Sequence, residues 1–302
     1  MNILSLFDGV GCGLVALKNL GIDVNTYYRS EIDENANKVF NYNHSDINTI
    51  ELGDVKNIKI ENIHNNIDLL MGGSPCQNFS FIGNRKGMVT KENIEITSLE
   101  QYLELKNKNF IFEGQSFLFW EYIRILKEAK PKWFLLENVV MAKKWSKIIT
   151  NTLKVEPILI DSALFSAQRR KRLYWTNIHI KELPKDNNIL LKNVLDFSIK
   201  FQPLKPFVFK TFGNKKRIDT MNWVENEKAN TLTTNRSHTT QYLLNKDKTK
   251  MRLLSRLEYE RLQTLPEDYT KILPITKACK AIGNGWNIKT IEHIFQALKD
   301  YK

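Results

Sequence analysis

The feature that most constrains the fold is an alternation of apolar runs and amphipathic stretches along the first 180 or so residues. Short apolar runs bounded by turn residues are typical of buried strands, and apolar side chains three or four apart are typical of helices. Strands are predicted within "MNILSLF", "VNTYYRSEID", "IDLLMGG", "PKWFLLENV", "EPILIDSALF" and "RLYWTNI". Helices are predicted within "LVALKNLGI", "ENANKVFNYN" and "SFLFWEYIRILKEAK". Because strands that alternate with helices form a mostly parallel sheet, the sequence predicts an α/β fold.

The pattern changes after this region, and a second domain is predicted there. The chain becomes rich in Lys, Asn and Thr with little helical periodicity, and strands are expected in stretches such as "PFVFKTF". Helical patterns return in "SRLEYERLQTL" and "IKTIEHIFQALKDY". We therefore expect a large domain over 1–179, completed by 275–302, and a small β-rich domain over 180–274. The polar segment 89–114 is expected to be a mobile loop or a surface subdomain.

The charge of the chain favours a polyanionic partner. Lys and Arg total 45 against 33 Asp and Glu, which leaves a formal net charge of +12. Basic side chains release counterions when they neutralise phosphates, which favours a nucleic acid; the coding bias of an AT-rich genome is the alternative explanation. No run approaches the roughly 18 apolar residues of a membrane helix, and no signal peptide is expected. The scattered cysteines, Cys12, Cys76 and Cys279, form no metal-type pair and favour a reducing cytoplasm.

Glycines follow the first predicted strand in the turn Phe7–Gly13, "FDGVGCG". Such glycines let the backbone approach a ligand at the start of a helix. Glu31, at the end of the second strand, lies where an acid commonly accepts hydrogen bonds from ribose hydroxyls. Asp54 lies where a side chain can hold an adenine amino group. No phosphate-loop lysine follows the glycines, so these positions favour an adenosine-containing cofactor.

Cys76 lies in the glycine-rich stretch "GGSPCQNFSFIGNRKG", directly after an apolar run. Pro75 restricts the residue before it to an extended shape, which fixes the direction in which the chain leaves the strand. An isolated cysteine is more often a buried, inert thiol. Cys76 instead lies beyond the strand, where a ligand can reach it, and is therefore a candidate nucleophile in its thiolate form.

Two other groups make a catalytic role for Cys76 more specific. Glu137 ends an apolar run, and a neutral carboxyl group in such a cleft can donate a proton or hydrogen bond to a substrate nitrogen; a surface carboxylate is the alternative. The basic run 168–172 can favour a thiolate or bind phosphate, unless it is a solvated turn. A nucleophilic thiol, a buried acid, cations and an adenosine cofactor together indicate alkylation of a pyrimidine by covalent catalysis.

At these residues the chain resembles the cytosine-5 DNA methyltransferase family, which uses S-adenosylmethionine. The motifs occur in the order typical of that family: "LFDGVGCG", "SPCQNFS", "ENV", "QRRKR", "RLQTLPEDY" and "GNGWN". The resemblance is greatest to the de novo branch with its bacterial and phage relatives. The chain departs from many members in "GNGWN", where proline and small residues are usual after Gly-Asn, and in a longer insertion after Cys76. The resemblance implies a Rossmann-like methyltransferase fold with a small β-rich target-recognition domain.

The resemblance also implies residue roles in the methylation of C5 of cytosine in a specific double-stranded DNA sequence. Cys76 would bond to C6 of a base flipped out of the duplex, and Glu137 would bind N3 and the exocyclic amine. Arg170 would lie near the base or Cys76, supported by Gln168 and Arg172. The implied cofactor-binding residues are Phe7, Asp8, Gly9, Gly11, Glu31, Ile32, Asp54, Val55, Ser74, Pro75, Leu118, Asn284 and Trp286. The implied DNA-binding residues are Gln77, Asn78, Ser80, Arg85, Thr231, Leu232 and Arg236.

Other functions stay open on the sequence alone. The same apparatus methylates cytosine in tRNA in one branch of the family, although the Cys-Phe-Thr signature of that branch is absent from the sequence. A catalytically silent DNA-binding homologue would be expected to lack Cys76 or Glu137, and both are present. An oxidoreductase would leave the thiol, "ENV" and "QRRKR" unexplained. We expect a cytoplasmic, nucleoid-associated monomer that needs no metal. The sequence does not determine the target motif, a paired restriction enzyme or assembly on DNA.

Overall fold

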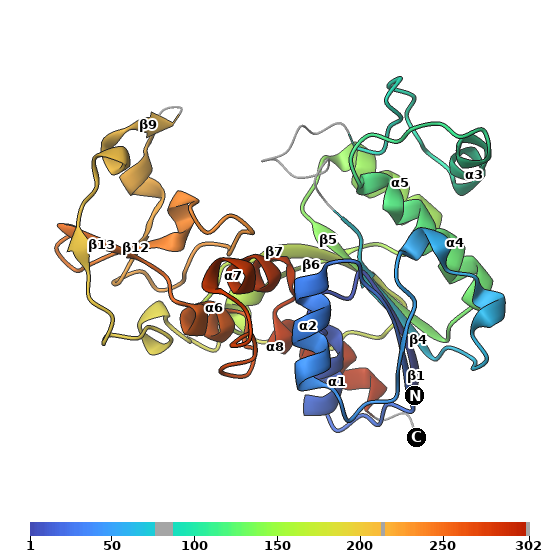
Figure 1. The fold of residues 1–302 in the computed structure, drawn as a ribbon, viewed down its shortest axis with the longest axis horizontal. Coiled ribbons are helices and arrows are strands. Elements are labelled where there is room, and N and C mark those ends of the chain that lie inside the picture. The colour runs from blue at the N-terminus through green and yellow to red at the C-terminus, as the bar shows by residue number, and fades with distance from the viewer. Residues whose placement is uncertain (76–86, 213–214, 300–302) are drawn as a thin grey trace.

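The computed structural model describes residues 1–75, 87–212 and 215–299, and its centre is a seven-stranded sheet (Figure 1). Its strand order is β3-β2-β1-β4-β5-β7-β6. The strands are β1 (Asn2–Leu6), β2 (Thr26–Ser30), β3 (Thr49–Glu51), β4 (Leu69–Gly73), β5 (Trp133–Val139), β6 (Ile158–Asp161) and β7 (Lys171–Thr176). Strands β1 to β5 are parallel, and β7 is antiparallel to both of its neighbours. The predicted α/β fold with a mostly parallel sheet is therefore confirmed.

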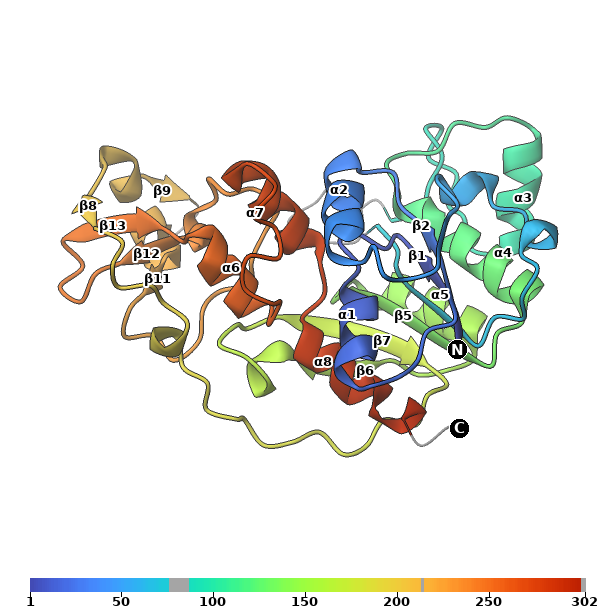
Figure 2. The same cartoon turned by 60° about the horizontal axis from the view of Figure 1, so that its bottom comes forward.

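Helices cover both faces of this sheet because alternate strand residues point to opposite sides. Ile3 and Leu69 point into one apolar cluster with α1, α2 and α8, whereas Leu4 and Leu70 point into another with α4 and α5. Figure 2 shows α1 and α8, which contact each other, on one face. The helices are α1 (Cys12–Asn19), α2 (Glu34–Asn43), α3 (Leu99–Asn107), α4 (Phe119–Ala129), α5 (Lys143–Leu153), α6 (Arg256–Leu262), α7 (Ile275–Asn284) and α8 (Ile288–Phe295).

A second, smaller sheet lies apart from the first, on the left in Figure 1. Its order is β11-β12-β13-β8, and β9 pairs with β10 beside it. The strands are β8 (Gln202–Pro203), β9 (Thr211–Phe212), β10 (Lys215–Lys216), β11 (Asn222–Trp223), β12 (Tyr242–Leu244) and β13 (Lys250–Leu253). The single strand expected in "PFVFKTF" is wrong. Pro206 lacks a backbone donor for a strand ladder and instead begins a short 3₁₀ helix, Pro206–Phe209, before β9.

The segment 89–114 folds against the large sheet domain. Ser98 accepts a hydrogen bond from the amide of Gln101 and caps α3. Tyr102 of α3 donates to the fully buried carboxylate of Glu121 in α4 (2.5 Å). Apolar residues along the segment are buried in the cluster of α4 and α5: Val89, Ile96, Leu99, Tyr102 and Leu105. Of the two expected states, the surface subdomain is the one observed.

The chain after the small sheet returns to the core of the large one. Leu262, Leu265, Tyr269 and Leu273 are buried in the same cluster as β1 and α1. By burial, α6 and the segment after it therefore group with α7 and α8. Within the described residues, no helix is both long and apolar enough to cross a bilayer.

His44 connects α2 to this returning segment. The Tyr269 hydroxyl donates to the carbonyl of Val10 (2.6 Å), so its oxygen accepts from His44 Nε2 (2.8 Å). His44 Nδ1 is buried with no hydrogen-bond partner within the described part of the chain. Burial, and then the charge of Lys18, lowers the pKa of His44 to about 4. The imidazole is therefore neutral in the folded protein.

A neutral buried histidine makes stability depend on pH. The unfolded chain takes up a proton on His44 near the usual pKa of 6.5, whereas the folded protein does so only near 4. His44 therefore contributes fully to the free energy of unfolding above pH 6.5, and this contribution falls by about 3 kcal/mol as the pH drops towards 4. Urea unfolding at pH 7 and pH 4.5 should show a smaller loss in His44→Gln than in the wild type. Equal losses would contradict this role.

Candidate active site

The turn between β1 and α1 lies at the carboxyl edge of the large sheet. Phe7 (φ 55°), Gly9 (φ 60°) and Gly11 (φ 84°) all have left-handed backbone conformations. A side chain at Gly11 would meet a second obstacle, because its Cβ atom would lie 2.7 Å from the Phe40 ring. The left-handed backbone at Gly9 and the contact of Gly11 with Phe40 explain why glycines occur in this turn, and an approach of the cofactor to it stays a prediction.

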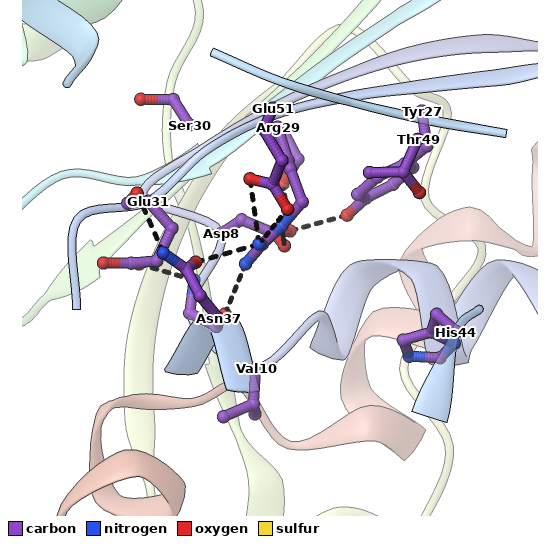
Figure 3. A network of polar contacts seen from close by, with 12 residues as sticks. Asp8, Val10, Tyr27, Arg29, Ser30, Glu31, Asn37, His44, Thr49 and Glu51 are labelled. Carbon is purple, nitrogen blue, oxygen red and sulfur yellow. Dashed lines mark hydrogen bonds and ion pairs between the residues drawn. The ribbon is translucent and has the colours of Figure 1, made fainter. Parts of the chain in front are cut away.

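Glu31 lies directly beyond β2, and its carboxylate organises the backbone of two segments (Figure 3). Its Oε2 accepts from the amide of Gly9 (2.8 Å), and its Oε1 accepts from the amides of Ile32 and Asp33 (both 2.7 Å). The Ile32 side chain is 65% exposed. Glu31 therefore ties the glycine turn to the start of α2, and Ile32 lies at the open edge beside it.

Asp8, a predicted cofactor-binding residue, has its carboxylate buried beneath the turn. It accepts hydrogen bonds from Ser5 Oγ (2.6 Å), the Tyr27 hydroxyl (2.6 Å) and Arg29 Nε (2.8 Å). Burial, together with the Asp8 charge, raises the pKa of Tyr27 well above its usual value, so the phenol remains a donor. Only the backbone of Asp8 can contact a ligand in this arrangement. Sequence reasoning missed Arg29, whose only signal was a cation inside a strand-like run.

Three residues predicted to bind the cofactor lie in or against one apolar cluster. Val55 and Leu118 are buried members of the cluster of α4 and α5, and Phe7 packs against it. Asp54 precedes Val55, where its carboxylate accepts from the amide of Lys56 (3.0 Å) and pairs with the Lys56 ammonium group (3.0 Å). The structure thus brings an apolar surface and a carboxylate to the same strand ends.

The chain leaves β4 along a fixed path. Asn138 of β5 donates to both the hydroxyl (3.1 Å) and the carbonyl (3.2 Å) of the buried Ser74. Pro75 follows and is the last described residue before 87. Five predicted residues lie outside the described residues: Cys76, Gln77, Asn78, Ser80 and Arg85.

Glu137 is held by partners from two distant parts of the chain. Its Oε1 forms an ion pair with Arg172 Nε (2.9 Å), and its Oε2 accepts from Trp286 Nε1 (3.2 Å). The residue is 8% exposed. A Cβ atom on Gly73 would lie 3.0 Å from both Glu137 Oε2 and Trp286 Nε1, so a side chain there would crowd this contact. Glu137 therefore lies in an ion pair with Arg172, and its role as a proton donor to a substrate stays a prediction.

Arg170 joins β7 to the segment between α7 and α8. Its guanidinium group donates to the carbonyls of Gly285 (2.9 Å), Gly283 (3.4 Å) and Leu232 (3.5 Å). The residue is 4% exposed. Asn284, predicted to support the cofactor site, is exposed at the end of α7. Arg170 therefore fixes the position of the connection that carries Trp286.

Gln168 extends this connection to the small domain and to α6. Its Nε2 donates to the Leu262 carbonyl (3.0 Å) and to Gln263 Oε1 (2.9 Å), and its Oε1 accepts from the Leu232 amide (2.9 Å). Gln263 in turn donates to the Gly285 carbonyl (2.9 Å). Sequence reasoning did not identify Gln263, although it lies within the "RLQTL" motif. These amides join four segments in the interior.

The described residues predicted to bind DNA are engaged within the protein. The Thr231 hydroxyl donates to the Arg169 carbonyl (2.6 Å), and Leu232 is 2% exposed. Arg236 donates to the Leu254 carbonyl (3.5 Å). These contacts hold the segment 231–236 against Arg169, just before β7, and against Leu254, directly after β13. A DNA contact from these three residues stays a prediction.

The two described thiols are poor nucleophiles. Burial raises the pKa of Cys12 to about 12. Burial also raises the pKa of Cys279 to about 11, although Arg236 acts in the opposite direction. Both remain protonated at neutral pH, so the candidate nucleophilic thiol is Cys76.

The fold is shared with solved methyltransferase structures. A DNMT2 variant from Spodoptera frugiperda superimposes with a TM-score of 0.70 at 16% identity, over 98% of this chain and 99% of that chain. The Entamoeba histolytica methyltransferase EhMeth gives a TM-score of 0.70 at 16% identity, over 99% and 98% of the two chains. The predicted Rossmann-like methyltransferase fold is therefore confirmed, including a second small sheet.

The family follows from the sequence itself. Residues 1–241 and 185–300 match the C-5 cytosine-specific DNA methylase family, and the chain belongs to that family. It is 32% identical over 188 residues to the orphan methyltransferase M.SPRI of Bacillus phage SPR, across 58% of this chain and 37% of that protein. It is 29% identical over 230 residues to M.Rho11sI of Bacillus phage rho11s, across 71% and 40%. The chain thus spans about two fifths of the length of these curated relatives.

Proposed function

We propose that this protein transfers a methyl group from S-adenosylmethionine to C5 of cytosine in a specific double-stranded DNA sequence. The observation that carries the proposal is the setting of Glu137. Arg172 and Trp286 hold its carboxylate at the end of β5, beside the end of β4 from which the chain continues to Cys76. An oriented acid next to a segment with a nucleophilic thiol suits addition to a pyrimidine ring.

The strand ends fit an adenosine-containing cofactor. Phe7, Val55 and Leu118 offer an apolar surface for the adenine ring. Glu31 Oε1 already accepts two hydrogen bonds and Oε2 accepts one, so Oε2 retains a lone pair for a ribose hydroxyl. Asp54 would hold the adenine amino group. When bound, S-adenosylmethionine supplies an electrophilic methyl group.

In the proposed reaction the target base leaves the duplex, because its ring carbons cannot be reached within the stack. The Cys76 thiolate bonds to C6, and the electron pair of the C5–C6 double bond makes C5 nucleophilic. Glu137 takes up a proton as the base binds and donates it to N3 when the thiolate adds, which neutralises the ring, while its other oxygen accepts from the exocyclic amine. C5 would then take the methyl group as its bond to the sulfonium sulfur of S-adenosylmethionine breaks, with S-adenosylhomocysteine as the leaving group. Loss of the C5 proton restores the double bond and expels the thiolate.

Double-stranded DNA is the proposed partner, and the small domain is the proposed reader of its sequence. A cavity of about 550 Å³ in this domain includes Arg169, Trp223, Asn230 and Lys248 in its lining. Lys248 Nζ lies 4.3 Å from the centroid of the Trp223 ring. A basic and aromatic surface suits phosphates and bases, and the net charge of +12 favours the same partner. We propose a monomer that acts on DNA in the cytoplasm.

The test uses duplexes of random sequence that contain 5-fluorocytosine, incubated with the protein and S-adenosylmethionine. Fluorine at C5 prevents the final proton loss, so a working enzyme stays bonded to its target. We expect a covalent adduct whose captured DNA shares one sequence motif. A parallel pool of transfer RNA with the same base should give none. Adducts with RNA alone, or none on either pool despite cofactor binding, would overturn the proposal.

A further inference from the structure

A network of charged groups lies beneath the glycine turn and takes no part in the proposed reaction (Figure 3). At its centre is Arg29 of β2, which is fully buried. Its guanidinium group donates to Asp8 Oδ2 (2.8 Å), Asn37 Oδ1 (2.9 Å), Glu51 Oε1 (2.9 Å) and the Gly9 carbonyl (3.0 Å). A single side chain therefore connects β2, β3 and α2 to the turn.

The backbone of Gly9 is held on both sides by residues at the end of β2. Arg29 Nη2 binds its carbonyl, while Glu31 Oε2 binds its amide. Arg29 lies within β2 and Glu31 directly follows that strand, so both contacts to Gly9 come from one short segment. Glu31 Oε2 accepts from the Gly9 amide and is also the oxygen with a lone pair left for a ligand. A shift of Gly9 would therefore move this oxygen as well.

The geometry of a guanidinium group is needed for this arrangement. Its nitrogen atoms point in fixed directions and reach four acceptors at once, whereas an ammonium group is a compact charge on a flexible stem. The Arg29 guanidinium carbon also lies 4.0 Å from the centroid of the Phe40 ring, which packs below it. Phe40 is the same ring that excludes a side chain at Gly11. The cluster thus holds Gly9 by hydrogen bonds and leaves no room for a side chain at Gly11.

We propose that Arg29 is a positioning residue for cofactor recognition: it fixes Gly9 so that Glu31 presents one oxygen to a ribose hydroxyl. This inference rests on the proposed function, which assigns the ribose to Glu31. Arg29 itself touches no ligand. Its removal should therefore weaken recognition of the ribose more than recognition of the adenine.

The experiment compares binding of S-adenosylhomocysteine and its 2′-deoxy and 3′-deoxy analogues by calorimetry. A hydrogen bond to a charged group corresponds to a loss of about 10- to 100-fold in affinity when the hydroxyl is removed. We expect that loss in the wild type for at least one analogue. We expect Arg29→Lys to bind S-adenosylhomocysteine about 10-fold more weakly than the wild type does. Within this variant, the affinities for S-adenosylhomocysteine and for that analogue should differ by less than about threefold.

A matched control separates this role from general stability. Arg252 of β13 in the small sheet is also a buried arginine. It pairs with the buried carboxylate of Glu258 in α6, and this pair lies away from the turn. Arg252→Lys should lower the melting temperature without changing the ratio of affinities. Should Arg29→Lys fail to fold, Glu51→Gln takes its place, because it weakens one Arg29 contact at a half-exposed side chain.

The outcomes distinguish two failures. In one, the wild type binds S-adenosylhomocysteine more tightly than a deoxy analogue while Arg29→Lys or Glu51→Gln shows the same ratio of affinities. That result overturns the role of Arg29 alone. A wild type that binds all three ligands equally shows that Glu31 does not hold the ribose, which overturns both the inference and that part of the proposed function. A reduced ratio in the Arg252→Lys control would also count against a specific role.

Discussion

Replacing Cys76 with alanine is expected to lower the rate of methyl transfer by at least about 10⁴-fold, while S-adenosylmethionine binding changes less than about twofold. The expected loss is this large because no other described thiol can substitute. Cys12 and Cys279 are both kept protonated by burial. The alanine variant retains Glu137 with Arg172 and Trp286, so binding and orientation of the base should survive without the covalent step.

The measurement is a single-turnover assay with labelled S-adenosylmethionine, run beside the 5-fluorocytosine trap. Cys279→Ala serves as the control, because it makes the same change at a buried cysteine of the same protein. We expect the control to methylate DNA and to form the adduct. A Cys76→Ala protein that still forms the adduct would exclude this residue as the nucleophile.

Replacing Glu137 with glutamine is expected to reduce kcat by about 10²- to 10⁴-fold with little change in S-adenosylmethionine affinity. Glutamine has nearly the same size and its amide oxygen can still accept from one of the two partners, Arg172 or Trp286. It cannot carry a proton to N3 of the base. The loss should therefore appear in the chemical step rather than in cofactor binding.

Glu258→Gln is the matched control for this change, because Glu258 is also a buried glutamate paired with an arginine. It should lower the melting temperature by at least as much as Glu137→Gln does, but leave a far larger share of kcat. A pH profile of kcat adds a second readout, since the wild-type profile should depend on a group that Glu137→Gln lacks. Equal kcat values for the two variants would contradict a catalytic role for Glu137.

Local pattern predicted the sheet and its helices well, because alternation of apolar and polar residues determines which segments can be buried. It also predicted that Glu31 and Glu137 lie at or near the ends of strands, where the structure has them. It failed for Arg29, since a charge inside a strand is tolerable only when acceptors arrive from elsewhere; Asp8 and Glu51 lie 21 and 22 residues away along the chain. It likewise did not predict Arg172 as the partner of Glu137, because this contact depends on the pairing of β5 with β7. The roles of the Cys76 segment remain predictions.

The contact between Glu137 and Trp286 has a consequence for the order in which the site is completed during synthesis. The two residues are 149 positions apart, and proteins generally begin to fold from their N-terminal end as the ribosome extends them. The contact of Glu137 with Arg172 can form while much of the chain is still to be synthesised. Its contact with the Trp286 indole can form only after α7 and the following turn have been made. Translation that stops before that turn therefore yields a sheet in which Glu137 lacks its contact with Trp286, so completion of the contacts around this carboxylate is linked to synthesis of the small domain.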